Sequence, residues 1–143
     1  MTTDPLPFRL KRPGWDTMGF SGIESVSHRA DGLLRLSDHG ITLEWAEVQT
    51  VEQLSFDRVG TDVNQLPAEW LELPLDRLTG AWLVGGWWLP RLELRARSME
   101  DFKDVPGVRG VTLTLRIQRR DRPLAQAITA ALTSRIQARA AGA

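Results

Sequence analysis

The clearest pattern of apolar and polar positions lies in the last third of the chain. Apolar and polar residues alternate over residues 111–118, which places four apolar side chains on one face of a half-buried strand. The next stretch predicts an amphipathic helix, with Asp121 placed to cap it and Pro123 in its first turn. The apolar stripe of this helix consists of Leu124, Ala127, Ile128, Ala131, Leu132 and Ile136.

Shorter stretches upstream predict antiparallel β-structure, because they are rich in apolar residues or alternate with a period of two. The strands are expected over residues 23–29, 33–37, 41–54, 70–75, 78–84 and 87–97. Turns are predicted at Ala30-Asp31-Gly32 and at Asp38-His39-Gly40, where aspartate and glycine favour turn conformations. Residues 57–69 and 98–110 are predicted loops, the second anchored by Phe102 and Val105.

These elements predict a mainly β fold closed by one C-terminal α-helix. An antiparallel sheet of six to eight strands must curl, and its apolar face must be covered. We therefore expect a bent sandwich or partly open barrel whose open end is closed by the helix. Residues 1–19 contain three prolines and are predicted to form an N-terminal arm, and residues 20–143 a single domain.

Three segments carry a resemblance to a known superfold. They are residues 32–43 (GLLRLSDHGITL), residues 73–80 (LPLDRLTG) and the final strand and helix, which pass through residues 120–125 (RDRPLA). This pattern resembles the pleckstrin-homology-like (PH-like) superfold, in particular small bacterial PH-like and GRAM-like domains. The resemblance implies a seven-stranded bent sandwich closed by the helix, and a non-catalytic binding or scaffold role.

The region of the first hairpin departs from the pattern of phosphoinositide-binding PH domains, which carry a lysine followed by Lys/Arg-x-Arg. Here the comparable positions offer Arg29 and Arg35 without lysine, and Asp31 and Asp38 lie beside them. The sequence therefore does not favour phosphoinositide binding. Many members of the superfold bind proteins, so we expect a protein partner or self-association.

Composition and charge narrow the picture mainly by exclusion. The 143 residues have a formal net charge of zero, which gives no general attraction to nucleic acid or to anionic membranes. Cysteine is absent, which excludes disulfides, thiolate catalysis and cysteine-ligated metals. No apolar run approaches the length of a transmembrane helix, and the first ten residues lack a signal-peptide pattern. We expect a cytoplasmic protein.

The sequence shows no constellation of residues that is typical of an enzyme. It contains no Gly-x-Ser-x-Gly motif and no tyrosine, and its helix carries no pair of metal ligands. We therefore predict no catalytic activity and no cofactor. His28, Asp31, Asp38 and His39 lie near predicted turns, but turn chemistry accounts for the last three, so no metal site is predicted.

The strongest candidate for a binding site is the segment Gly85-Gly86-Trp87-Trp88-Leu89-Pro90. Adjacent residues in a strand point to opposite faces, so Trp87 and Trp88 are not both expected in one core. An exposed tryptophan is typical of interaction surfaces. The alternative is that the helix or the N-terminal arm covers it.

Arginines follow the two tryptophans along the same predicted strand. Arg91, Arg95 and Arg97, with Arg116 near them, can line one sheet face and bind an acidic partner through paired hydrogen bonds. The alternative is a solvated face on which these residues pair with Glu93.

A different class of function also stays open, in which a small barrel holds an apolar molecule or lipid between sheet and helix.

Overall fold

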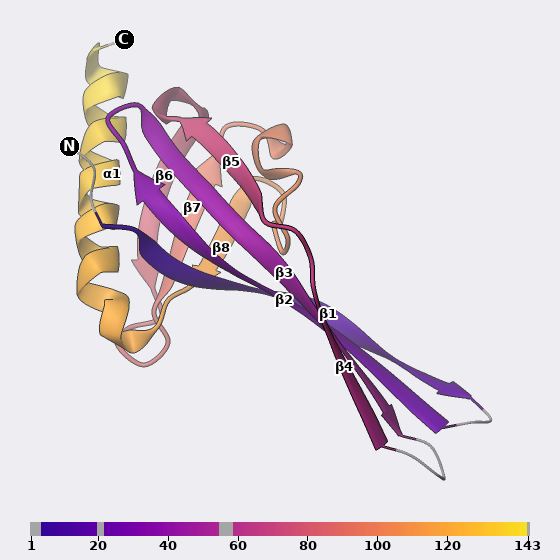
Figure 1. Cartoon of the computed structure of the whole chain (residues 1–143). Coiled ribbons are helices and arrows are strands. Elements are labelled where there is room, and N and C mark those ends of the chain that lie inside the picture. Colours follow the sequence, from indigo (N-terminus) through magenta and orange to yellow (C-terminus); the bar gives the residue numbers. More distant parts are fainter. Residues whose placement is uncertain (1–3, 20–21, 55–58, 143) are drawn as a thin grey trace.

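The computed structural model of the chain describes residues 4–19, 22–54 and 59–142. Within these residues, eight antiparallel strands form one sheet, and a single α-helix follows the last strand (Figure 1). The strands are β1 (Leu6–Gly19), β2 (Gly22–Leu36), β3 (Gly40–Leu54), β4 (Val59–Gln65), β5 (Glu69–Pro74), β6 (Leu78–Val84), β7 (Arg91–Ala96) and β8 (Thr112–Arg116). The helix is α1 (Arg122–Gly142), and short 3-10 helices occupy η1 (Leu75–Arg77), η2 (Met99–Phe102) and η3 (Arg119–Asp121).

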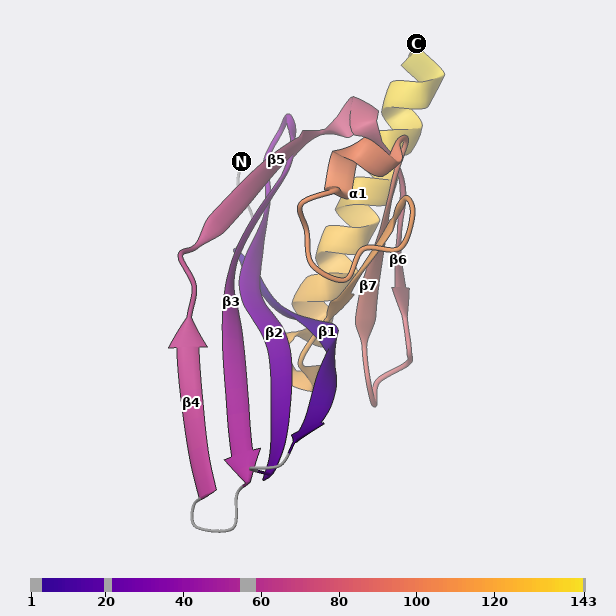
Figure 2. The same cartoon turned by 90° about the vertical axis from the view of Figure 1, so that its right-hand side faces the viewer.

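The sheet is curled into a half-barrel. Its strand order is β4-β3-β2-β1-β8-β7-β6. β5 pairs with residues 40–45 of β3, whereas β4 pairs with residues 48–54 of the same strand. Two perpendicular views show β6, β7 and β8 curling round opposite the first strands, with α1 running along the open side (Figures 1 and 2). The predicted fold class, a curled antiparallel sheet closed by a C-terminal helix, is confirmed.

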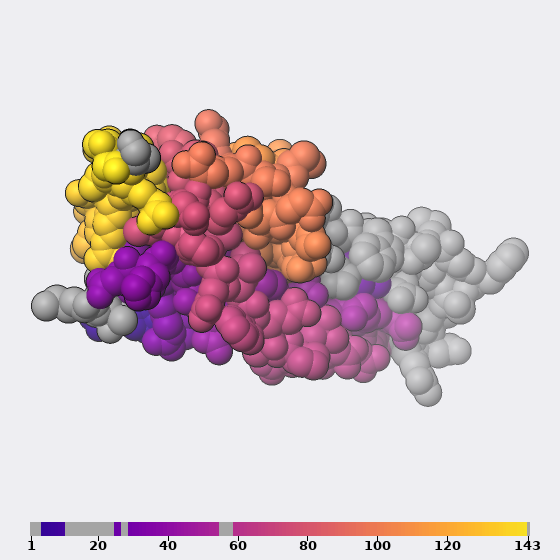
Figure 3. Space-filling model, turned by 90° about the horizontal axis from the view of Figure 1, so that it is seen from above, coloured from indigo at the N-terminus to yellow at the C-terminus, as the bar shows by residue number. Residues whose placement is uncertain are grey.

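The core lies between the concave face of the sheet and α1. Alternating leucines of β7 and β8 point into it and are fully buried, as the period of two predicts. On the helix the buried residues are Ala125, Ile128 and Leu132, whereas Ala127, which the sequence placed in the stripe, is exposed. In the space-filling view the helix lies directly against the segments of the second half of the sheet (Figure 3).

Polar contacts fix the helix to both halves of the sheet. The Thr133 hydroxyl donates to the Ala81 carbonyl of β6 at 3.3 Å. The Arg135 guanidinium donates to the Ser37 carbonyl, at the turn between β2 and β3, at 2.6 Å. The helix therefore joins two regions of the sheet that are far apart in strand order.

The first four strands continue beyond this core as a twisted ribbon (Figure 1). In its outer part, residues 48–54 of β3 pair with residues 59–65 of β4, and every residue of β4 is exposed. The sequence predicted a loop over residues 57–69, which is wrong for the part that forms β4. A strand exposed on both faces needs no alternation of apolar and polar residues, so its sequence carries no strand pattern.

The predicted N-terminal arm is also wrong, because Leu6–Gly19 forms β1 and pairs with β2 along its length. Pro13 lies where the register shifts between Arg12 and Trp15, and a bulge tolerates a residue that donates no ladder hydrogen bond. The sequence also suggested that Phe8 and Trp15 attach this segment to the rest of the fold. Phe8 is buried, whereas the side chain of Trp15 lies outside the described residues.

Of the two predicted turns, the structure confirms one. The Ser37 amide donates to the Gly40 carbonyl at 2.9 Å, which closes the turn at Asp38-His39. Ala30-Asp31-Gly32 instead lies inside β2. Glycine is needed at position 32 for close packing, since a Cβ there would lie 2.5 Å from the ring of Phe8.

The predicted loop over residues 98–110 is anchored as expected, with Phe102 and Val105 buried. Asp101 in η2 accepts two hydrogen bonds from Arg77, with Nε–Oδ1 at 3.0 Å and Nη2–Oδ2 at 3.1 Å. This hydrogen bonding raises the pKa of the Arg77 guanidinium above its ordinary value. Asp101 also accepts from the Ser98 amide at 3.1 Å, which completes a capping box.

Candidate binding site

Trp87 and Trp88 lie in the turn between β6 and β7, not in a strand. The strand predicted over residues 87–97 begins at Arg91, so the two side chains do not alternate between faces. Both are exposed, at 62% and 61%, and Leu89 is exposed at 75%. The two indole rings stack with centroids 4.9 Å apart and an interplanar angle of 8°. The turn therefore holds a large aromatic surface in water.

The backbone of this turn is constrained at both ends. Gly85 has φ +84°, and a Cβ there would lie 2.1 Å from the Leu89 carbonyl oxygen, so a side chain would disrupt the turn. At the other end, Pro90 is buried and its carbonyl accepts from the Ile117 amide at 3.0 Å. The exposed tryptophans thus belong to a defined turn that is joined to the end of β8.

Arg119, in η3, adds a cation to the tryptophan pair. Its Cζ lies 4.7 Å from the centroid of Trp88 and 5.7 Å from that of Trp87. Contacts of this kind at exposed sites contribute about 0.5–1 kcal/mol. Arg119 belongs to the arginine-rich second half of the sequence, but only the tertiary structure brings the start of the helix beside the β6–β7 turn.

The three arginines selected from the sequence share an exposed face but do not form one site. Arg91 lies next to the tryptophan turn. Arg95 instead places its Cζ 5.0 Å from the ring centroid of Trp82, and Arg97 donates from Nε to the Asp76 carbonyl at the far end of β7. Glu93 forms no ion pair with any described residue, so the expected pairing on this face is absent there.

Two further arginines extend the basic surface across the sheet. Arg116 on β8 lies directly opposite Arg91 on one side and opposite Arg9 of β1 on the other. All three side chains are exposed on the convex face. Asp31 ends this row on β2, and its Oδ1 accepts from Arg9 Nε at 2.9 Å.

A cleft of about 740 Å³ lies between the tryptophan turn and the basic row. It is lined by Gly85, Trp88, Leu89, Pro90, Arg91, Arg116, Ile117 and Arg119. Arg116 and Ile117 also line a neighbouring cleft of about 400 Å³ beside Arg9 and Asp31. The larger cleft is therefore lined both by aromatic and aliphatic side chains and by three guanidinium groups.

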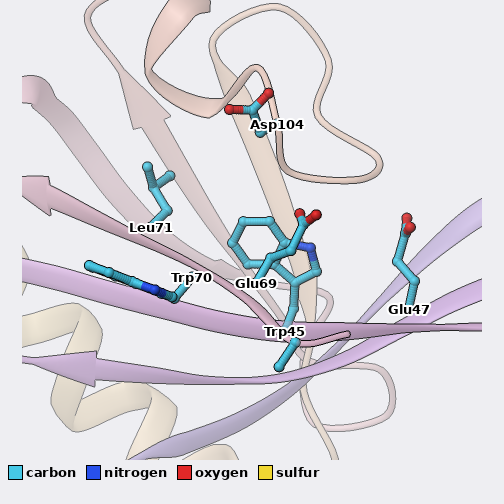
Figure 4. Close-up of a pocket in the computed structure, with 7 residues that line it drawn as sticks. Trp45, Glu47, Glu69, Trp70, Leu71 and Asp104 are labelled. Atoms are coloured by element: carbon cyan, nitrogen blue, oxygen red, sulfur yellow. The ribbon is translucent and has the colours of Figure 1, made fainter. Parts of the chain in front are cut away.

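A second cleft has the opposite charge (Figure 4). This space of about 610 Å³ is lined by Trp45 and Trp70 together with Glu47, Glu69 and Asp104. Figure 4 shows that Asp104 belongs to a loop across the cleft from the strands that carry the other side chains. The residues that line this cleft include three carboxylates and no arginine or lysine, whereas the larger cleft is lined by three arginines and no carboxylate.

The described residues contain neither a candidate metal site nor a candidate membrane-spanning helix. No three histidine, aspartate or glutamate side chains there are grouped so that they could hold a metal ion; the side chain of His28 lies outside that part. No helix in the same part combines the length and apolar character needed to cross a bilayer.

No family model, curated protein or solved structure shows significant similarity to this chain. The residues of the site itself are therefore the basis for inferring a function.

Proposed function

We propose that this protein is a non-catalytic binding or scaffold module of the PH-like type, which contacts a protein partner through the turn that carries Trp87 and Trp88. The observation that supports this proposal best is that two stacked indoles and Leu89 are held in water on a constrained turn. Tryptophan and arginine are enriched among the residues that dominate binding energy at interfaces. The absence of cysteine and the resemblance to bacterial PH-like domains favour a cytoplasmic setting.

The alternative function, an apolar ligand held between sheet and helix, gains no comparable support. The helix residues that face the sheet, Ala125, Ile128 and Leu132, are fully buried by protein. None of the clefts described above is lined by a residue of α1.

The proposal is tested by affinity capture from the native cell extract, followed by reconstitution with the purified candidate partner. The affinity of the full chain for that partner is measured by calorimetry for the wild type, Trp88→Ser and Trp70→Ser. Trp70 is the matched control because it is 66% exposed but lines the acidic cleft. We expect Trp88→Ser to weaken binding by about tenfold or more, and Trp70→Ser to leave it unchanged.

Equal effects of the two substitutions, or none from Trp88→Ser, would contradict this proposal. Light scattering of the purified chain distinguishes a second copy from a different partner. If the wild type is a dimer and Trp88→Ser is a monomer, the contact is self-association.

A further inference from the structure

The arginines beside the tryptophan turn have no carboxylate partner among the residues that the structure describes. Arg91 and Arg116 lie directly opposite each other on β7 and β8, where like charges destabilise a sheet. Among the described residues, no carboxylate oxygen lies within 4.0 Å of the side-chain nitrogens of Arg91, Arg116 or Arg119. The carboxylate that ends the row, Asp31, is already shared between Arg9 at 2.9 Å and Arg29 at 3.7 Å.

We propose that Arg91, Arg116 and Arg119 bind a carboxylate group of the partner, supplied by an aspartate or glutamate that lies next to an apolar residue. This inference rests on the proposed function, because the same cleft includes Trp88. A guanidinium group offers a planar pair of donors that matches the two oxygens of a carboxylate. The apolar neighbour would contact Trp88, Leu89 and Pro90, which line the same cleft.

The distribution of charge around the cleft favours one acidic group over a polyanion. A nucleic acid needs a continuous basic track for successive phosphates. Here Asp31 ends the row across the strands, and Glu93 interrupts the arginines along β7. A bound nucleic-acid strand would therefore meet Asp31 if it ran across the β-strands and Glu93 if it ran along β7. A single side-chain carboxylate is short enough to avoid both.

The experiment selects ligands with a phage-displayed library of random twelve-residue peptides on the immobilised full chain. Peptides that are enriched are synthesised with a fluorescent label, and their affinity is measured by anisotropy for the wild type, Arg91→Gln, Arg116→Gln and Trp88→Ala. Arg109→Gln is the control, because Arg109 is an exposed arginine in the loop at the opposite end of β8. Circular dichroism establishes that each variant is folded.

We expect the enriched peptides to share an acidic residue beside an apolar one. Replacing Arg91 or Arg116 should raise Kd by about tenfold or more, since one charge-assisted hydrogen bond accounts for a change of this size. Arg109→Gln should leave Kd unchanged. Replacing the acidic residue of the peptide by its amide should weaken binding to the wild type and to Arg109→Gln more than binding to Arg91→Gln or Arg116→Gln.

The possible failures distinguish the inference from the proposed function. If Trp88→Ala abolishes binding while both arginine variants bind normally, the carboxylate site is wrong and the tryptophan contact stands. If only the arginine variants lose binding, the tryptophan contact is wrong. The inference is overturned if the library yields no peptide whose binding depends on Arg91 or Arg116. It is also overturned if labelled single-stranded DNA binds through these arginines and displaces the peptide.

Discussion

The docking of α1 onto the sheet leads to a quantitative prediction for Leu132→Ala. Leu132 is fully buried between the helix and the sheet, and its neighbour Thr133 donates a hydrogen bond to β6. The substitution removes about three methyl or methylene groups, each contributing about 0.8 kcal/mol, and the residual cavity adds to this loss. We expect the free energy of unfolding to fall by about 3 kcal/mol.

Urea denaturation monitored by tryptophan fluorescence and by far-ultraviolet circular dichroism measures this loss. For a chain of this length the same change corresponds to a decrease in Tm of about 10 °C. Leu89→Ala is the matched control, because Leu89 is 75% exposed and its truncation should change stability by less than about 0.5 kcal/mol. If Leu132→Ala costs no more than Leu89→Ala, the helix is not docked and the explanation of the fold is wrong.

Three further substitutions test the supporting contacts. Asp101→Ala should lower the midpoint of urea unfolding, because it removes both hydrogen bonds from Arg77 and the one from the Ser98 amide; an unchanged midpoint would show that these contacts are not stabilising. Gly85→Ala should cost about 1–3 kcal/mol in the same assay, since its φ is +84°; wild-type stability would contradict the constrained turn. Arg116→Gln should stabilise the chain by about 0.2–1 kcal/mol at low salt by relieving repulsion from Arg91, and the gain should shrink in 1 M NaCl; a loss of stability would argue against that repulsion.

The elements that the sequence predicted well are those whose side chains face the core on one side. In β7, β8 and the helix, burial imposes a local period on the chain, so the pattern indicates the element directly. The same reason explains the anchoring of Phe102 and Val105 in an otherwise irregular loop. β4 was missed because neither of its faces is buried.

Other errors came from aspartate, glycine and proline residues, which are typical of turns and loops but also occur inside strands. Asp31-Gly32 has the composition of a turn, but Gly32 makes room for the ring of Phe8, and Asp31 pairs with Arg9. Proline at position 13 suggested a loose arm, but it lies at a bulge in β1. In each case a long-range contact decided between conformations that the local sequence permits.

Some residues of the candidate site were identified from the sequence, and others only from the tertiary structure. The sequence by itself identified Trp87 and Trp88, on the reasoning that neighbouring residues of a strand cannot both enter one core, and it identified Arg91 with Arg116 near it. Only the tertiary structure placed Arg9 and Arg119 with them, since β1 pairs with β8 and the helix begins beside the β6–β7 turn. Periodicity records which face of an element is buried, whereas the pairing of distant strands decides which charges become neighbours.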